Sequence, residues 1–481
     1  MRYQTVIGLE IHVELSTSSK LFCGCAVTFG EKPNTQCCPI CVGMPGVLPV
    51  LNKKAVEYCI KAGLALNCDI AKFNRMDRKN YFYPDLPKAY QTSQLNLPVC
   101  LNGYLDIQTK DDLKRVGITR IHLEEDAGKL IHDRSEVGTL IDYNRGGVPL
   151  IEIVTEPQLH TADEANIFLE SLKSILEYID VSDCKMQEGS LRCDVNISVR
   201  AEGQNSLGKR VEIKNMNSFR AAFRAMEYEG KRQKDLLEKG GIVLQETRRW
   251  DDVDSKTYSM RSKEEAHDYK YFPEPDLVPV IVSRTWLAAI KSEIPELPFQ
   301  KKKRYIEEYG LSSYDADILT SSKYLAKHFE QILLEYNNPK IVVNWLMGDY
   351  LRLLKDRGIS IEAAPVLPNA FSKLLALVDK GVISGSIAKT VFEEMFDTGK
   401  CPESIIKQKG LEQITDTFEI EEIVEQVIAQ NTKSVEDFKE GKAKALGFLI
   451  GQAMKATRGK ANPQLLNEIL LRRLEDLKHS H

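Results

Sequence analysis

Four short segments of this sequence alternate between apolar and polar residues, and this alternation limits the fold more than any other feature. In residues 6–15 the odd-numbered positions from 7 onward hold Ile, Leu or Val, and the even-numbered positions from 8 onward hold Gly8, Glu10, His12 and Glu14. The same period of two recurs in residues 118–126, 192–200 and 211–215. Because successive side chains of a strand point to opposite faces, each segment predicts a strand with one apolar face. Such strands are typical of an antiparallel sheet packed on a core.

The polar faces of these predicted strands carry short carboxylates, His and Asn, whereas a solvated face more often carries Thr, Lys, Ser or Gln. The residues of interest are Glu10, His12, Glu124, Glu125, Asp194, Glu212 and Lys214. Carboxylates that share one sheet lie within several ångströms of one another, which is unfavourable unless a cation neutralises them. Mg²⁺ prefers oxygen ligands and usually brings substrate phosphates. Two alternatives therefore stay open, a plain solvated sheet and a cleft for Mg²⁺ and phosphate.

Four cysteines form two close pairs near the N-terminus. Cys23-x-Cys25 and Cys38-x-x-Cys41 are separated by twelve residues, and Cys37 is surplus. Two thiolate pairs on either side of a turn can close a tetrahedral zinc site. Four protein ligands leave no open position, so the zinc would be structural; unmetallated thiols are the alternative.

The sequence changes character near Pro295. Residues 1–294 combine strand and helix patterns, whereas the remainder is helical in pattern. With a second boundary between Gly399 and Gly410, we predict an α+β fold with domains at 1–294, 295–405 and 406–481. The first is built on an antiparallel sheet, the second is all-helical and the third is a helical tail.

Three helix starts are marked by capping residues. Thr161-x-x-Glu164 forms a capping box before an apolar periodicity. Ser434 is expected to cap a helix that continues to Met454, and Asn462-Pro463 is expected to open the last helix.

Charge and hydropathy limit the location and the partners of the chain. No run of about 18 apolar residues is present, so we expect no membrane helix and a cytoplasmic protein. The net charge is −4, yet residues 431–481 hold ten Lys and Arg against six Asp and Glu. A basic tail suits a polyanionic partner, although many solvated helices have this composition. No Gly-rich phosphate-binding motif is present, so a nucleotide site would be unconventional.

Several long stretches, in the same order, resemble the B subunits of the aspartyl/glutamyl-tRNA(Asn/Gln) amidotransferases. The matching stretches lie at residues 6–15, 77–88, 122–129, 144–152, 188–194, 212–218, 269–275, 441–449 and 461–464. The similarity extends over essentially the whole length. It implies a cradle-like catalytic domain with a zinc-binding insertion at 23–41, a helical domain and a mobile tail that contacts tRNA.

The resemblance also implies a reaction. ATP would phosphorylate the side-chain carboxylate of Glu-tRNA(Gln) or Asp-tRNA(Asn), and ammonia would displace phosphate to give Gln-tRNA(Gln) or Asn-tRNA(Asn). A partner amidase (glutaminase), known as the A subunit in this family, would release the ammonia from glutamine. A small third protein, the C subunit, would complete the heterotrimer. Which of the two aminoacyl-tRNAs is the substrate stays open.

Candidate site residues follow from the polar strand faces, the basic tail and the resemblance. Mg²⁺ is expected at Glu10, His12, Glu124 and Glu125. Phosphate or developing negative charge is expected to meet Lys79, Lys88 and Lys214. For Asp194 and Glu212, binding metal and positioning ammonia are both open. The tRNA backbone is expected to contact Lys442, Lys444, Lys455, Arg458 and Lys460.

Two rival functions compete with this interpretation. A zinc-containing RNA-binding or assembly protein without its own active site would explain the cysteines and the basic tail but leave the acidic faces unexplained. A free-standing ligase that uses ammonia alone would need no amidase partner.

Overall fold

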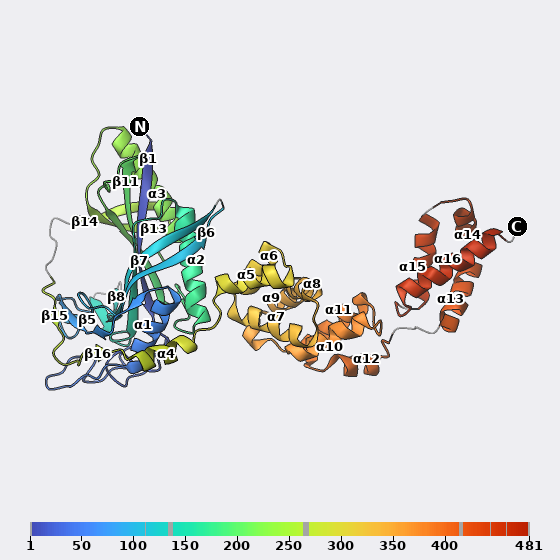
Figure 1. Cartoon of the computed structure of the whole chain (residues 1–481), viewed down its shortest axis with the longest axis horizontal. Coiled ribbons are helices and arrows are strands. Elements are labelled where there is room, and N and C mark those ends of the chain that lie inside the picture. The colour runs from blue at the N-terminus through green and yellow to red at the C-terminus, as the bar shows by residue number, and fades with distance from the viewer. Residues whose placement is uncertain are drawn as a thin grey trace. The chain divides into compact units, whose positions relative to one another are not determined.

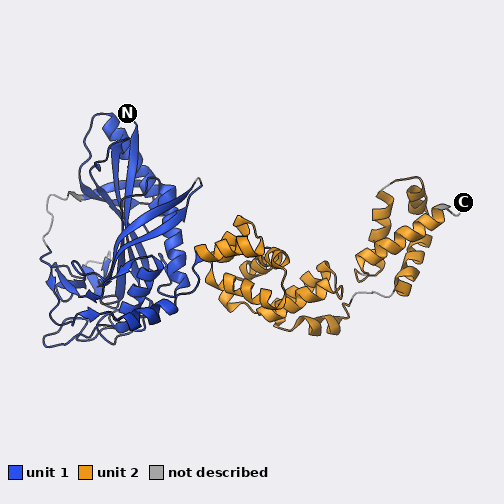
Figure 2. Cartoon of the chain, in the orientation of Figure 1, with its two compact units in different colours: residues 1–298 blue, residues 299–481 orange. Residues whose placement is uncertain are grey.

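The computed structural model describes residues 2–110, 112–132, 138–262, 269–412, 417–442, 444–457 and 459–479. The chain divides into two compact units, Met1–Pro298 and Phe299–His481 (Figure 2). In the part of the chain that is described, no helix is both long and apolar enough to cross a membrane.

A nine-stranded sheet forms the centre of the first unit (Figure 1). Its spatial order is β14 (Lys256–Ser262), β13 (Glu246–Asp251), β12 (Val211–Lys214), β11 (Leu191–Ala201), β1 (Tyr3–Glu14), β10 (Pro149–Thr155), β7 (Leu113–Glu125), β6 (Cys100–Gln108) and β2 (Asp69–Ile70). Neighbouring strands are antiparallel except for the parallel pair β12 and β13. The four alternating segments form β1, β7, β11 and β12, which confirms the predicted strands and the α+β class.

The register of the central strands brings their polar residues onto one face. Glu10 of β1 lies opposite Asp194 of β11, and His12 lies opposite Glu152 of β10. Glu152 in turn lies opposite His122 of β7. Polar residues from strands distant in the sequence therefore form a continuous surface.

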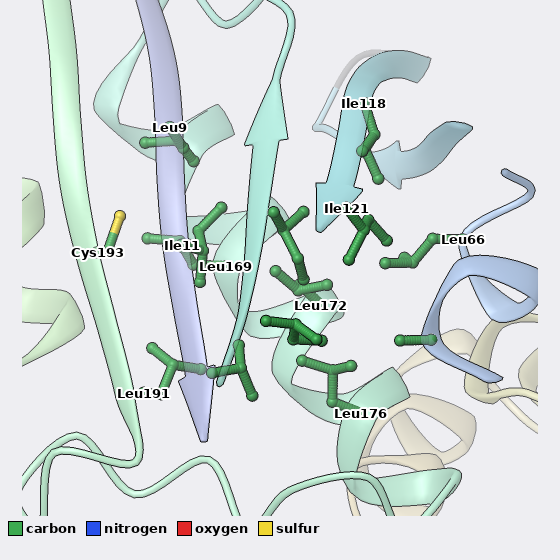
Figure 3. Packing of buried hydrophobic residues seen from close by; sticks show 14 of the residues in the cluster. Leu9, Ile11, Leu66, Ile118, Ile121, Leu169, Leu172, Leu176, Leu191 and Cys193 are labelled. Atoms are coloured by element: carbon green, nitrogen blue, oxygen red, sulfur yellow. The ribbon is translucent and has the colours of Figure 1, made fainter. Parts of the chain in front are cut away.

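The other face of the sheet packs on helices. These helices are α1 (Lys53–Ala65), α2 (Ala162–Tyr178) and α3 (Phe219–Glu238), and α4 (Arg284–Ser292) packs against α1. Leu9 and Ile11 of β1 belong to one buried cluster with Leu169 and Leu172 of α2 (Figure 3). Burial of such side chains stabilises the fold by about 1.5–3 kcal/mol each. The apolar half of each alternating strand thus fixes which face is left for polar residues.

Helix α2 begins where the capping box predicts. The Thr161 side chain accepts a hydrogen bond from the backbone N–H of Glu164 at 3.1 Å, which confirms the cap. The Glu164 carboxylate accepts from the backbone N–H of His160 at 2.7 Å, one residue before the expected donor.

Three small sheets complete the first unit. The first contains β15 (Phe272–Pro273), β4 (Asp77–Asn80) and β5 (Tyr90–Ser93); the second β16 (Val280–Ile281) and β3 (Phe73–Asn74); and the third β8 (Lys129–His132) and β9 (Thr139–Asp142). Strand β5 lies against β7 of the main sheet. This contact brings the loop before β5, with Lys88, to the end of β7.

The described residues of the second unit form helices and no strands. The helical elements are α5 (Pro298–Tyr309), α6 (Ser313–Thr320), α7 (Lys323–Glu335), α8 (Pro339–Trp345), η1 (Leu346–Tyr350), α9 (Leu351–Arg357), η2 (Ile361–Ala363), α10 (Pro368–Asp379), α11 (Gly385–Thr398), α12 (Pro402–Lys409), α13 (Thr417–Gln430), α14 (Thr432–Lys439), α15 (Lys444–Ala456) and α16 (Pro463–His479). Two separate buried clusters hold them, one within residues 305–406 and one within residues 420–474.

One helix prediction in this unit is wrong. Helix α14 begins after Asn431, so Ser434 lies inside it and does not cap it. The expected helix to Met454 is interrupted at Gly441, whose φ of +87° ends the first segment before α15 begins. The last start is confirmed, because Asn462 accepts hydrogen bonds from the N–H groups at the beginning of α16.

Candidate active site and metal centre

Three adjacent strands bring one imidazole and two carboxylates together on the polar face. His12 of β1, Glu124 of β7 and Glu152 of β10 each offer a ligand atom, and these atoms all lie within 4.8 Å of one another. His12 Nε2 is 3.7 Å from Glu124 and 3.5 Å from Glu152. The Glu124 side chain is only 3% exposed. The two carboxylates are held close enough to share one cation.

Two imidazoles lie beside this pair of carboxylates. His122 Nε2 lies 3.4 Å from both Glu124 and Glu152. Burial alone would raise the pKa of Glu152, but the hydrogen bond to His12 and the nearby imidazoles lower it below its usual range. Burial opposes protonation of His12, yet Glu152 and Glu124 raise its pKa overall. The two carboxylates therefore favour the protonated form of His12.

The donor set fits a divalent cation. Carboxylate oxygens suit Mg²⁺, and an imidazole nitrogen adds a neutral ligand once its proton has left. His12 and Glu124 belong to the magnesium set predicted from the sequence, and Glu152 was missed. Its signal was the alternation within β10, where Glu152 is the polar residue between Ile151 and Ile153.

Glu125 lies away from this cluster, because consecutive strand residues face opposite ways. Its carboxylate forms an ion pair with Lys88 and accepts a hydrogen bond from the backbone N–H of Thr92 at 2.7 Å. Lys88 Nζ also lies 3.9 Å from the centre of the Phe22 ring and 4.7 Å from that of Tyr90. Lys88 lines a cavity of about 220 Å³.

A second cluster of polar side chains lies on the neighbouring strands β1, β11 and β12. Asn196 Nδ2 donates a hydrogen bond to Glu10 Oε1 at 2.8 Å, which places Glu10 with Asn196 and apart from the three ligand atoms at His12. Lys214 Nζ is 2.6 Å from Asp194 and 3.2 Å from Glu212. Burial would lower the pKa of Lys214, but these two carboxylates raise it, so the ammonium stays charged.

Glu14, at the end of β1, and Asp126, just after β7, form a further carboxyl pair that was not predicted. Asp126 is 2.8 Å from Arg192 and 3.6 Å from Arg145. Burial and the neighbouring Asp126 charge raise the pKa of Glu14 to about 8. The pair therefore holds a proton near neutral pH, while the two guanidiniums keep Asp126 ionised.

Lys79 lies outside these groups. Its Nζ is 5.7 Å from the centre of the Tyr81 ring and 5.1 Å from that of Tyr269. Both are cation–π contacts, so the Lys79 ammonium lies against an aromatic wall formed by the two tyrosine rings.

The two cysteine pairs form a second metal-binding arrangement. The Sγ atoms of Cys23, Cys25, Cys38 and Cys41 all lie within 4.8 Å of one another. In a zinc tetrahedron the sulfur atoms are about 3.8 Å apart, so this set fits the ion after a small contraction. Cys37 lies apart, with its Sγ 3.9 Å from Asn144 Oδ1.

Within the cysteine group the electrostatics favour a thiolate at Cys41. The hydrogen bond from Cys23 outweighs burial and lowers the pKa of Cys41 to about 4, with help from the backbone N–H of Cys38 and the charge of Lys20. The fully buried Lys20 has its Nζ 3.8 Å from Cys41 Sγ. The same contact raises the pKa of Cys23, so without a metal the two sulfurs share a proton.

The predicted tail cations are dispersed. Lys442 is held by Asp437 at 2.6 Å and Glu440 at 2.9 Å. Lys444 and Lys455 are exposed at the two ends of α15, and Lys460 is half-buried before α16. Arg458 lies outside the described residues.

The sequence matches two protein-family descriptions. The GatB/GatE catalytic domain matches residues 5–288, and the GatB domain matches residues 327–474. The first match contains the strands of the sheet, apart from the first two residues of β1, and both metal-binding arrangements.

Similar proteins match along their whole length. A protein of Caldicellulosiruptor bescii is 62% identical over 480 residues, covering 99% of this chain and 100% of the relative. One from a Thermoanaerobacter species is 62% identical over 470 residues, covering 98% and 99%, and one from Geotalea daltonii is 53% identical over 478 residues, covering 99% and 100%. Each is named as the B subunit of an aspartyl/glutamyl-tRNA(Asn/Gln) amidotransferase.

Proposed function

The chain belongs to the family of aspartyl/glutamyl-tRNA(Asn/Gln) amidotransferase B subunits, and from this premise we propose that it activates a tRNA-bound side-chain carboxylate with ATP and amidates it. The substrates would be Glu-tRNA(Gln), Asp-tRNA(Asn) or both. The observation that supports this most is the cluster of His12, Glu124 and Glu152 on the polar face of the sheet.

The proposed chemistry follows from the weakness of a carboxylate as an acyl donor. A carboxylate oxygen of the substrate attacks the γ-phosphorus of ATP, and ADP leaves. Ammonia then attacks the carbonyl carbon, the carbon–oxygen bond to phosphate breaks, and the nitrogen loses a proton. Phosphoryl transfer of this kind depends on alignment and on neutralisation of negative charge more than on a covalent catalyst.

The residues of the cluster would perform the alignment. Mg²⁺ bound by His12, Glu124 and Glu152 would neutralise the phosphate oxygens. His122 contacts both carboxylates and would fix their orientation.

The lysines of the first unit are proposed to meet negative charge. Lys88 borders a cavity and Lys79 lies on an aromatic wall, so both present cations for phosphate. Lys214 neutralises Asp194 and Glu212, and we propose that this group positions ammonia. Glu125 then keeps Lys88 in place.

The other parts of the chain are proposed to serve assembly and recognition. The four cysteines would hold a structural Zn²⁺ in the insertion at 23–41. Because their buried clusters are separate, we propose that residues 295–405 act as a helical domain and residues 406–481 as a tail that contacts tRNA. The name of the relatives implies a complex of several chains. We propose that this chain is cytoplasmic and that the other members of the complex are an amidase (the A subunit) and a small protein (the C subunit).

Isotope transfer tests the activation step. Glu-tRNA(Gln) with ¹⁸O in its side-chain carboxylate is incubated with the assembled complex, ATP, Mg²⁺ and glutamine. We expect one labelled oxygen to appear in inorganic phosphate for each amide formed. Amide formation with unlabelled phosphate would exclude the acyl phosphate.

The same assay separates the rival functions. If this chain only binds RNA or assists assembly, Glu124→Gln will leave phosphate release and amide formation unchanged. If it is a free-standing ligase, the purified chain will form the amide from ammonium chloride at the rate of the assembled complex.

A further inference from the structure

An unsatisfied acceptor lies beside Glu10. Asn196 donates its amide N–H to Glu10 Oε1, and its own Oδ1 is buried with no hydrogen-bond donor among the described residues. A buried carbonyl oxygen without a donor costs about 1–3 kcal/mol. The arrangement therefore suits a ligand that brings N–H groups.

A cavity gives such a ligand room. Its volume is about 220 Å³, and Glu10 and Asn196 both line it. Its other walls come mainly from apolar and backbone atoms, including Gly8, whose missing side chain leaves the strand surface flat. Few polar groups in a mostly apolar cavity are typical of a site that orients one functional group.

The charges around the cavity favour a cation. Glu10 lies opposite Asp194 in the sheet, and Lys214 is already engaged by Asp194 and Glu212. The lining contains one cation, Arg210, which is exposed and therefore screened by solvent. A carboxylate and an amide oxygen together are suitable acceptors for an ammonium group.

The spacing along β1 relates this position to the metal cluster. Glu10 and His12 lie on the same face two residues apart, which separates them by about 7 Å along the strand. In a glutamyl group the α-nitrogen and the side-chain carboxyl carbon are separated by four bonds, or about 5 Å when extended. A carboxylate at the cluster thus leaves the α-nitrogen within reach of Glu10.

We propose that Glu10 and Asn196 bind the α-ammonium group of the aminoacyl ester and so direct its side-chain carboxylate to the cluster of His12, Glu124 and Glu152. This inference rests on the proposed function. It assigns to Glu10 the recognition of the substrate in place of magnesium binding. The site would select an acyl group that carries both an α-ammonium and a side-chain carboxylate.

An acyl group without the amine provides the test. tRNA(Gln) is acylated chemically with glutarate, which is a glutamyl group lacking its α-amino group, and is compared with Glu-tRNA(Gln). For the unaltered complex we expect kcat/KM of amide formation to be about 10- to 100-fold lower with glutaryl-tRNA, because a charge-assisted hydrogen bond is lost.

Variants of the two acceptors should remove this discrimination. Asn196→Leu keeps the side-chain size without the acceptor, and Glu10→Gln keeps the shape without the charge. Both are expected to raise KM for Glu-tRNA and to bring the ratio between the two substrates to about two-fold or less. Arg200→Lys, four residues along the same face of β11 and outside the residues that line the cavity, is the matched control and should keep the full ratio.

The outcomes are distinct. Equal use of both tRNAs by the unaltered complex would overturn the inference and leave the proposed function intact. A raised KM for ammonium chloride with unchanged discrimination in both variants would assign the cavity to ammonia and also overturn it. Failure of the unaltered complex to amidate both Glu-tRNA(Gln) and Asp-tRNA(Asn) would overturn the proposed function and this inference together.

Discussion

At the scale of single residues, the face of the sheet toward which a side chain points decides its chemical role. Glu124 and Glu125 are neighbours in the sequence, yet one faces His12 and the other forms an ion pair with Lys88. The sequence-based prediction assigns both to the same ion, whereas in the structure Glu124, and not Glu125, shares a group of ligand atoms with His12 and Glu152. The position of Glu152 depends on the register of β10 against β1, and no local pattern encodes that register.

Glu152 therefore makes a sharp test of the metal site. Replacing it by glutamine removes a negative ligand but keeps the side-chain volume. We expect the Mg²⁺ concentration for half-maximal activity to rise at least about 10-fold, and the rate to fall about 100-fold. A magnesium titration of amide formation measures both.

Asp106→Asn is a suitable control, because Asp106 lies on β6 of the same sheet in an exposed ion pair with Arg115. That variant should keep the magnesium dependence. Unchanged magnesium affinity in the Glu152 variant would remove this residue from the site.

The cysteine group can be tested by metal content. A variant with Cys38→Ser and Cys41→Ser should lose one equivalent of zinc per chain, because only two thiolates remain. Cys37→Ser should keep it, since Cys37 Sγ lies beside Asn144. Elemental analysis of the purified protein distinguishes the two. Full zinc in the double variant would refute the ligand assignment.

At the scale of elements, the sequence predicts where a segment starts better than where it is interrupted. Period-two alternation identified β1, β7, β11 and β12, and the capping box identified the start of α2. The helix expected to run to Met454 breaks at Gly441, because a glycine can adopt the left-handed conformation that stops a helix. A glycine inside a helical pattern does not reveal from sequence whether it adopts that conformation.

The cap of α2 carries a stability prediction. Thr161→Ala removes the acceptor for the Glu164 N–H, and we expect the free energy of unfolding of the first unit to fall by about 1 kcal/mol. Thr161→Ser keeps the acceptor, so its free energy of unfolding should fall by less than half of that amount. Urea unfolding of both variants measures the difference. Equal losses would show that packing of the threonine methyl group matters more than the cap.

Helix α7 carries a prediction for pH. Burial lowers the pKa of His328 to about 4, and its Nε2 has no hydrogen-bond partner among the described residues. Between pH 6.5 and 4 the unfolded chain binds a proton that the folded chain does not. The free energy of unfolding of this unit should therefore fall as pH falls through that range, by at most about 3 kcal/mol, and then level off.

Hydrogen exchange on the full chain measures this loss of stability. The amides of α7 should lose protection toward pH 4 after correction for the intrinsic exchange rate, and His328→Phe should remove most of the loss. The amides of α2, in the other unit, provide an internal reference. If His328→Phe lost the same amide protection toward pH 4, a group other than His328 would be responsible.

At the scale of the whole molecule, charge is divided between a catalytic unit with buried carboxylates and a tail with exposed lysines. Lys444 and Lys455 are exposed on α15, whereas Lys442 is engaged by two carboxylates. An exposed lysine can displace counterions from RNA without first losing an ion pair. We therefore expect these two residues to contribute more to tRNA binding than Lys442.

Salt dependence tests this division of roles. Replacing Lys444 and Lys455 by glutamine should weaken tRNA binding to the assembled complex and lower the slope of log K against log salt by about 1.5–2, the value for two lost phosphate contacts. Lys442→Gln is the matched control and should change the slope by less than about 0.5, because Asp437 and Glu440 already neutralise it. A slope unchanged by the double replacement, measured by filter binding from about 50 to 300 mM salt, would mean that these two lysines of α15 do not contact RNA phosphates. Because the replaced side chains are exposed, a loss of folding would not account for a changed slope, and circular dichroism of each variant verifies this.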